Sequence, residues 1–257
     1  MGIANQEKRD HMNISTTTHE RHQKFSIMST ISWLIILTVG VQLCVGIIIL
    51  SMFKVTRVEF NDLESLLLRP EIMLLGMIIT VIISIPLIRK ATRVSEDTFP
   101  FHFLAIKPIE QATLKKTLVL GVLYYCLMST FMHLVNIDTP QYMLDAKFQV
   151  NSSLDLAIHI ISICIMAPIF EELIFRGLAF SRLQYSKAGP IGAIIVTSIF
   201  FTIIHIQYEL MILVFLFPTA LLYGFIRYKT DNVTYCIALH ILCNSLSTFE
   251  LFVLLQP

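Results

Sequence analysis

Residues 168–177 of the chain read PIFEELIFRG, a stretch that places three ionisable side chains among apolar ones. They are Glu171, Glu172 and Arg176, and the apolar run around them extends from about residue 155 to 182. Such a run is long enough to cross a bilayer as a helix. Ionisable side chains at that depth are costly, so they normally face a bundle interior or a water-filled cavity. The stretch therefore predicts a functional or structural polar site inside a membrane helix.

The composition of the whole chain supports this setting. Of 257 residues, 55% are hydrophobic and only 14% are charged, whereas soluble domains carry about 25% charged residues. We predict an all-α, polytopic transmembrane helical bundle. The net charge is +1 and no basic block is present, so we expect no nucleic-acid partner. The five cysteines lie in apolar runs without a CxxC pair, which favours buried small side chains over disulfides or metal ligands.

An apolar helix of about 20 residues spans a bilayer, and by this measure the chain contains about seven spans. The last one is long enough to break near residues 247–250, which would give eight. Residues 1–25 form a polar tail, and residues 26–257 are predicted to form a single membrane domain. The predicted spans are 26–53, 71–88, 117–135, 155–182, 190–206, 210–226 and 232–255.

Lysine and arginine predict the orientation of these spans. With seven spans and a cytoplasmic N-terminus, the inner loops contain 14 of these residues and the outer loops contain 4. Cytoplasmic loops of membrane proteins are enriched in Lys and Arg. We therefore expect a multi-pass protein of the cell membrane with its N-terminus in the cytoplasm.

Helical spacing separates the two glutamates of the opening stretch. Glu172 and Arg176 are four residues apart, so they share a helix face and can form an ion pair. Glu171 lies about 100° around the helix from Glu172 and cannot share that face equally. The pair is interpreted as structural support, while Glu171 must find partners on other helices.

Two later spans supply candidate partners. Phe201 and His205 are four residues apart near the end of span five, and His240 and Asn244 repeat that spacing in span seven. Counted at about 1.5 Å of rise per residue, Glu171, His205 and His240 lie roughly 18, 22 and 12 Å from the cytoplasmic ends of their spans. These depths are compatible with one layer near the middle of the membrane.

A glutamate, two histidines and an asparagine in a wet intramembrane pocket suggest hydrolysis. A partly desolvated glutamate is suited to act as a general base, and a histidine can hold or polarise the same water. An asparagine amide can donate a hydrogen bond to a developing oxyanion. No serine or cysteine lies at a matching position, which favours water as the nucleophile. Glu171, His205 and His240 are also a set that could hold zinc, although the HExxH spacing of many zinc proteases is missing.

The three motifs, in this order and on separate predicted helices, resemble the CPBP family of CAAX-processing and bacteriocin-processing intramembrane endopeptidases, also called the Abi family. They are Glu171-Glu172-x-x-x-Arg176, Phe201-x-x-x-His205 and His240-x-x-x-Asn244, within about residues 155–248. The resemblance implies that Glu171 activates water with the help of His205, and that His240 and Asn244 stabilise the oxyanion. It further implies that Glu172 and Arg176 brace the site. No cofactor is expected on this reading, although zinc remains possible.

The size of the chain and its polar N-terminal tail resemble bacterial members of that family, and specifically immunity proteins encoded beside plantaricin-type bacteriocins. The expected partner is a peptide or protein substrate reached from the membrane, with a bacteriocin or its membrane receptor as one possibility. A different class of function is non-catalytic immunity, in which the protein binds or blocks the bacteriocin or its receptor. A transporter or proton relay is the third alternative, because relays also use intramembrane carboxylates and histidines.

Overall fold

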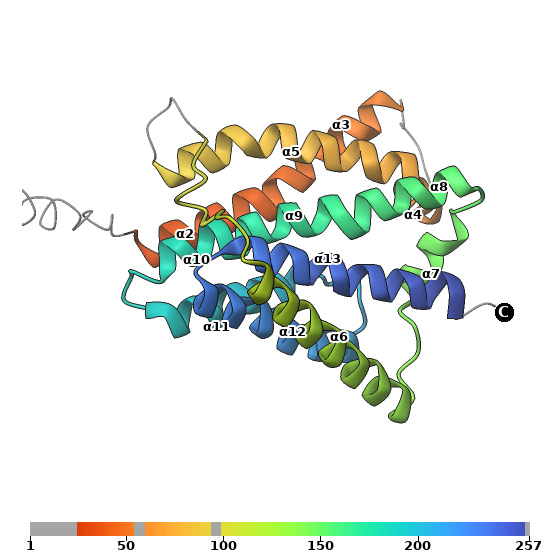
Figure 1. Ribbon diagram of the computed structural model, residues 1–257. Helices are drawn as coiled ribbons and strands as arrows, with labels where there is room; N and C mark the ends of the chain where they lie inside the picture. The colour runs from red at the N-terminus through yellow and green to blue at the C-terminus, as the bar shows by residue number, and fades with distance from the viewer. Residues whose placement is uncertain (1–24, 54–59, 94–98, 255–257) are drawn as a thin grey trace, which may run out of the picture.

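The computed structural model describes residues 25–53, 60–93 and 99–254, and within these ranges the regular elements are all helical. The predicted polar tail lies almost entirely outside the described residues. Figure 1 shows helices running side by side along the long axis of the molecule. The first two long helices consist of α2 (Ile27–Ile35), η1 (Ile36–Gly40) and α3 (Val41–Met52), followed by α5 (Pro70–Thr92).

The remaining helices complete the bundle. The third and fourth long helices are α6 (Gln111–Leu134) and a composite of α8 (Ser153–His159), η2 (Ile160–Met166), α9 (Ala167–Glu172), η3 (Leu173–Ala179) and α10 (Phe180–Leu183). They are followed by α11 (Gly189–Ile203), α12 (Leu210–Thr230), α13 (Val233–Phe249) and η4 (Glu250–Leu254). Two short helices, α4 (Phe60–Leu67) and α7 (Gln141–Phe148), lie in connections and were not predicted.

Six of these helical segments in the described part of the chain are long and apolar enough to cross a membrane. The predicted all-α membrane bundle is thus confirmed. The predicted fifth span is shorter than expected: α11 covers Gly189–Ile203 instead of 190–206. The helix tightens at its end, where the backbone N–H of His205 bonds to the carbonyl of Thr202, three residues earlier. The last helix continues from Val233 to Leu254, so no break forms at residues 247–250.

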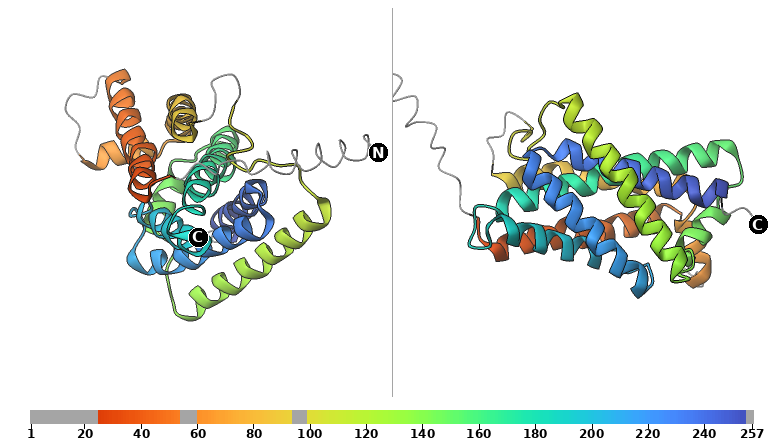
Figure 2. Two further views of the ribbon diagram at one scale, coloured as in Figure 1. Left: turned by 90° about the vertical axis from the view of Figure 1, so that its left-hand side faces the viewer. Right: turned by 60° about the horizontal axis from the view of Figure 1, so that its bottom comes forward.

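The composite fourth helix lies inside the bundle. Figure 1 shows α9 between α5 on one side and α13 on the other, and Figure 2 shows α6 along the outer edge of the bundle. Side chains cap the starts of this helix and of α13. The Ser152 hydroxyl accepts a hydrogen bond from the backbone N–H of Asp155, 3.1 Å away, and caps the start of α8. The Asn232 side-chain oxygen caps α13 by accepting a hydrogen bond from the backbone N–H of Thr234 at 3.0 Å.

Two arginines that the orientation count assigned to loops are in fact buried in the protein. Arg182 donates to the hydroxyls of Thr30 and Ser29 and to the carbonyl of Ala91, so it joins the fourth helix to the first two. Arg227 is also buried on α12. Their side chains form structural contacts with neighbouring helices. They are therefore weaker evidence for the orientation of the spans in the membrane than charges in loops are. The cytoplasmic N-terminus stays a prediction.

An acidic residue at the end of α12 gives stability a pH dependence. Asp231 adopts a left-handed backbone conformation and pairs with Arg227, 2.7 Å away, and with Lys107. Burial raises the pKa of its carboxyl, but the hydrogen bonds and charges of Lys107 and Arg227 outweigh burial and leave the pKa below its usual value. The pKa of the Asp231 carboxyl is thus lower in the folded protein than in the unfolded chain, where it is about 3.9. The stabilisation is present above the unfolded pKa and is lost as the pH falls through the folded pKa.

We therefore expect the thermal unfolding midpoint in detergent to fall more for the wild type than for Asp231→Asn when the pH is lowered below about 4. Asparagine tolerates the left-handed conformation, so the substitution removes the charge without straining the backbone. Because the Asp231 side chain is 62% exposed, the difference should stay below about 1 kcal/mol. Parallel curves for the two proteins at every pH would contradict this account.

Candidate active site

The helix that carries both glutamates departs twice from α-helical geometry. The π-helical segments η2 and η3 flank α9, so Glu171 and Glu172 lie at the end of a six-residue α-helical segment between them. Wide π turns inside α-helices frequently occur at functional sites, because they rotate the following side chains and loosen the backbone hydrogen bonding. The opening stretch is therefore locally irregular where the chemistry-bearing residues lie.

Pro168 explains one of the irregular contacts. In η2 the backbone N–H of Ala167 bonds to the carbonyl of Ser162, five residues earlier. By the same spacing, the backbone N–H of the next residue would bond to the carbonyl of Ile163. That residue is Pro168, which has no N–H. The side-chain amide of Asn244 donates to the Ile163 carbonyl instead, at 2.9 Å. One of the two N–H groups of Asn244 thus joins α13 to the glutamate-bearing helix.

This contact predicts a compensating pair of substitutions. Asn244→Leu leaves the Ile163 carbonyl without its donor and should lower the free energy of unfolding by about 1–3 kcal/mol. Adding Pro168→Ala restores a backbone N–H and should recover part of that loss. Denaturant titration in mixed micelles measures both changes. Pro218→Ala in α12 is the matched control, because Pro218 also lies inside a membrane helix but is remote in sequence from Ile163; equal recovery with this control would disprove the assignment.

The predicted ion pair is confirmed. Arg176 Nη1 lies 3.0 Å from Glu172 Oε1, and both side chains are fully buried. Arg176 Nη2 donates to the carbonyl of Ala220 on α12 at 2.7 Å, and the guanidinium lies 4.8 Å from the ring centre of Phe201. The pair therefore connects three helices, which agrees with its interpretation as a brace.

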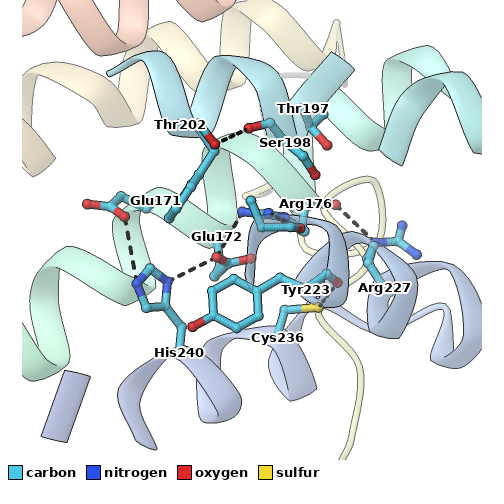
Figure 3. A network of polar contacts seen from close by, with 12 residues as sticks. Glu171, Glu172, Arg176, Thr197, Ser198, Thr202, Tyr223, Arg227, Cys236 and His240 are labelled. Atoms are coloured by element: carbon cyan, nitrogen blue, oxygen red, sulfur yellow. Dashed lines mark hydrogen bonds and ion pairs between the residues drawn. The ribbon is translucent and has the colours of Figure 1, made fainter. Parts of the chain in front are cut away.

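Glu172 also orients a histidine. Its Oε1 atom lies 3.0 Å from His240 Nδ1, as Figure 3 shows. With Glu172 ionised beside Arg176, its oxygen accepts and His240 Nδ1 carries the hydrogen. His205 is held in the same way, because its Nδ1 atom lies 2.7 Å from the carbonyl of Phe201, which can only accept. In both neutral imidazoles the Nε2 atom is consequently an acceptor.

These two acceptor nitrogens converge on Glu171. Its Oε2 atom lies 3.9 Å from His205 Nε2 and 3.9 Å from His240 Nε2. The separations exceed direct hydrogen-bond length, and at such distances a bridging water is the natural connection. Three acceptors facing one another also require a shared proton or a donor between them. A water molecule satisfies this requirement because it donates two hydrogens.

Sequence reasoning missed two members of this network. Tyr223 on α12 is buried, and its ring centre lies 4.9 Å from that of His240. Arg227, four residues later, donates from Nε to the carbonyl of Arg176 at 3.0 Å. Their spacing places both side chains on one face of α12, and a polar face on an apolar helix is the signal that would have identified them. Figure 3 shows both beside the Glu172–Arg176 pair.

A cavity of about 340 Å³ leads to this site. His240 and Asn244 contribute to its wall, together with Phe201 and Tyr223. The rest of the wall comes from α6, α7 and the segment before it, Tyr208, α12, α13 and η4. Phe201 thus lines the pocket, and the cavity reaches His240 and Asn244, while Glu171 and His205 are not among its lining residues.

The zinc site that the sequence leaves open as an alternative stays a prediction. Across the described residues, no group of three or more His, Cys, Asp or Glu side chains is placed to hold a metal ion. Glu171, His205 and His240 approach one another, but Asn244 is directed at a backbone carbonyl.

Comparison with known proteins found one family match. No curated protein and no solved structure matches the chain. Residues 153–246, however, match the family described as type II CAAX prenyl endopeptidase Rce1-like. The matched segment contains all three motifs and every side chain that converges on Glu171. Residues 153–246 are therefore a domain of the Rce1-like CAAX protease family, which belongs to the CPBP family.

Proposed function

We propose that the protein is an intramembrane endopeptidase that hydrolyses a peptide bond with a water molecule activated by Glu171. The family is one of CAAX proteases, which supports protease activity at the level of the family. The single observation that carries the proposal is the convergence of two imidazole Nε2 atoms on Glu171 Oε2 at 3.9 Å each. That geometry holds a water between a carboxylate and two acceptor nitrogens, with its oxygen available for attack.

The proposed reaction follows from these positions. The water donates one hydrogen to Glu171 and is oriented by His205 while its oxygen bonds to the carbonyl carbon of the scissile peptide. The proton passes to Glu171, and the carbonyl oxygen becomes the oxyanion. The second N–H of Asn244 donates to that oxygen, while His240, held by Glu172 at Nδ1, orients the water through its Nε2 acceptor. Collapse of the intermediate breaks the C–N bond, and Glu171 returns the proton to the leaving amine.

The experiment that tests this proposal uses purified full-length protein in liposomes with a defined peptide mixture. Mass spectrometry should detect new peptide termini that increase with time. His240→Ala and His205→Ala should each reduce their formation by about 10²-fold or more, because each removes a group that orients water or supports the transition state. Unchanged product formation by both variants would overturn the proposal.

Metal removal provides a separate prediction. Because the proposed reaction relies on side chains alone, prolonged dialysis against EDTA should leave the rate of peptide cleavage unchanged. The measurement compares initial rates before dialysis, after dialysis and after addition of Zn²⁺. A loss on dialysis that Zn²⁺ restores would replace Glu171 as general base with a metal-centred mechanism.

The biological role that we propose is processing of a peptide or protein that enters from the membrane, either in bacteriocin self-immunity or in prenyl-CAAX-like maturation. Cells that express the protein should survive exposure to the cognate bacteriocin if the role is immunity. Loss of protection with Glu171→Ala at normal protein levels supports an immunity role that depends on proteolysis. Full protection by this variant supports the alternative, in which the protein binds or blocks the bacteriocin or its receptor without cleaving it.

A further inference from the structure

A second carboxylate lies on the wall of the cavity that reaches the candidate active site. Glu250 follows α13 and lines the cavity together with His240 and Asn244. It is ten residues after His240, so helical rise separates the two by about 15 Å along the cavity wall. Glu250 also lies outside the family-matched residues 153–246, and therefore outside the motifs that the family shares.

The Glu250 carboxylate is held in place by hydroxyl groups. The Tyr125 hydroxyl donates to Oε2 at 2.5 Å, and the Ser129 hydroxyl lies 3.3 Å from Oε1. Both hydroxyls project from α6, which also lines the cavity. Within the described ranges, no lysine, arginine or histidine nitrogen lies within 4.0 Å of this carboxylate. Lys147, the nearby cation of α7, donates to the carbonyl of Leu251 at 2.9 Å.

The other titratable acid and base of the cavity wall, besides His240, Cys243 and the tyrosines, are Asp138 and His133, and no lysine or arginine contributes. Three methionines add flexible apolar surface, which suits side chains of varied shape; they are Met128, Met132 and Met143. Glu250 is partly exposed and has no cationic partner in the part of the chain that the structure describes, so a cation supplied by a ligand would add a charge-assisted hydrogen bond to this carboxylate.

We propose that Glu250 is a specificity subsite that binds a cationic side chain, lysine or arginine, of the peptide substrate. This inference rests on the proposed peptidase function, because it assumes that a peptide occupies the cavity with its scissile bond near Glu171. The Glu250 carboxylate accepts hydrogen bonds from the bound ammonium or guanidinium, while Tyr125 and Ser129 hold its orientation. The two independent observations are the lack of a cationic nitrogen within 4.0 Å of this carboxylate among the described residues and its place in the lining of the same cavity as His240.

The distance between the two groups defines where the cation must be. An extended peptide advances about 3.3 Å per residue, so about 15 Å corresponds to four or five residues. The subsite therefore selects peptides whose basic residue lies about four or five positions from the cleaved bond. A basic residue adjacent to that bond should bring no advantage.

The test uses pairs of synthetic peptides of one sequence that differ only in carrying lysine or norleucine at a single scanned position. Wild-type protein in liposomes should cleave the lysine peptide with a kcat/KM about tenfold higher than the norleucine peptide, at the favoured position only. Glu250→Gln keeps one acceptor oxygen for the Tyr125 and Ser129 hydroxyls but has no charge, so this ratio should fall toward one. Glu209→Gln, which changes an exposed carboxylate outside the cavity lining, should leave the ratio unchanged.

Binding separates this inference from the peptidase proposal. Fluorescence anisotropy of the labelled peptides with Glu171→Gln protein measures the same lysine preference without cleavage. Glu250-dependent binding without any cleavage by the wild type would support the subsite and overturn the peptidase function. Cleavage with a lysine preference that Glu250→Gln does not change, or with none, would overturn the subsite and leave the peptidase function standing.

Discussion

Glu171→Gln is expected to slow peptide hydrolysis by about 10²–10⁴-fold, the range typical for loss of a general base. Glutamine has nearly the same size as glutamate but cannot accept the proton of the attacking water. The two histidine nitrogens 3.9 Å away then face a neutral amide, and the water loses its base. Because the change affects the chemical step, kcat should fall while KM changes little. Initial rates measured over a range of peptide concentrations provide both constants.

Glu209→Gln is the matched control for this substitution. Glu209 precedes α12 and its Oε1 atom accepts from the backbone N–H of Gln141 at 3.3 Å, so it tests the effect of losing a carboxylate outside the site. This variant should retain wild-type kcat. A Glu171→Gln protein that keeps more than about a tenth of the wild-type kcat would show that Glu171 is not the general base.

Arg176→Met is expected to produce the largest loss of stability, about 3–5 kcal/mol, because it leaves a buried carboxylate without its cation. Glu172 and Arg176 are both fully buried, so water cannot compensate for the missing charge. Removing both charges in the double variant Glu172→Leu with Arg176→Met should cost less than the sum of the two single changes. Denaturant titration of the folded fraction in mixed micelles measures all three proteins.

Lys187→Met is the control for this series. Lys187 is exposed in the segment between α10 and α11, so its removal should change the free energy of unfolding by no more than about 0.5 kcal/mol. Additive losses in the double variant would mean that Glu172 and Arg176 do not depend on each other, and the interpretation of the pair as a brace would be wrong.

The sequence predicted the parts of the fold that depend on local chemistry. Apolar runs located the long helices, and spacing by four residues identified the Glu172–Arg176 pair. The end of α11 was predicted three residues too late, because apolar Ile204 and Ile206 extend the hydrophobic run beyond the hydrogen-bonded helix. Hydropathy measures preference for lipid, and it does not detect the tightened last turn that places His205 outside α11.

The candidate site could be predicted only in part for a different reason. The identities of Glu171, His205 and His240 were evident from motifs, but the partners that orient them are non-local. The link between Asn244 and Ile163 depends on where a π segment meets Pro168, and the cavity position of Glu250 depends on the packing of α6 against α13. Such contacts arise from tertiary packing, which periodicity along one helix does not encode. The division into a polar tail and one membrane domain stays a prediction.

The most direct measurement of the central claim is cleavage of one defined peptide in H₂¹⁸O by wild-type, Glu171→Gln and Glu209→Gln proteins in identical liposomes. The account predicts one ¹⁸O atom in the new C-terminal carboxylate, formed at similar rates by the wild type and Glu209→Gln and about 10²-fold or more slowly by Glu171→Gln. Labelled product formed equally fast by Glu171→Gln, or no labelled product from the wild type, would contradict it.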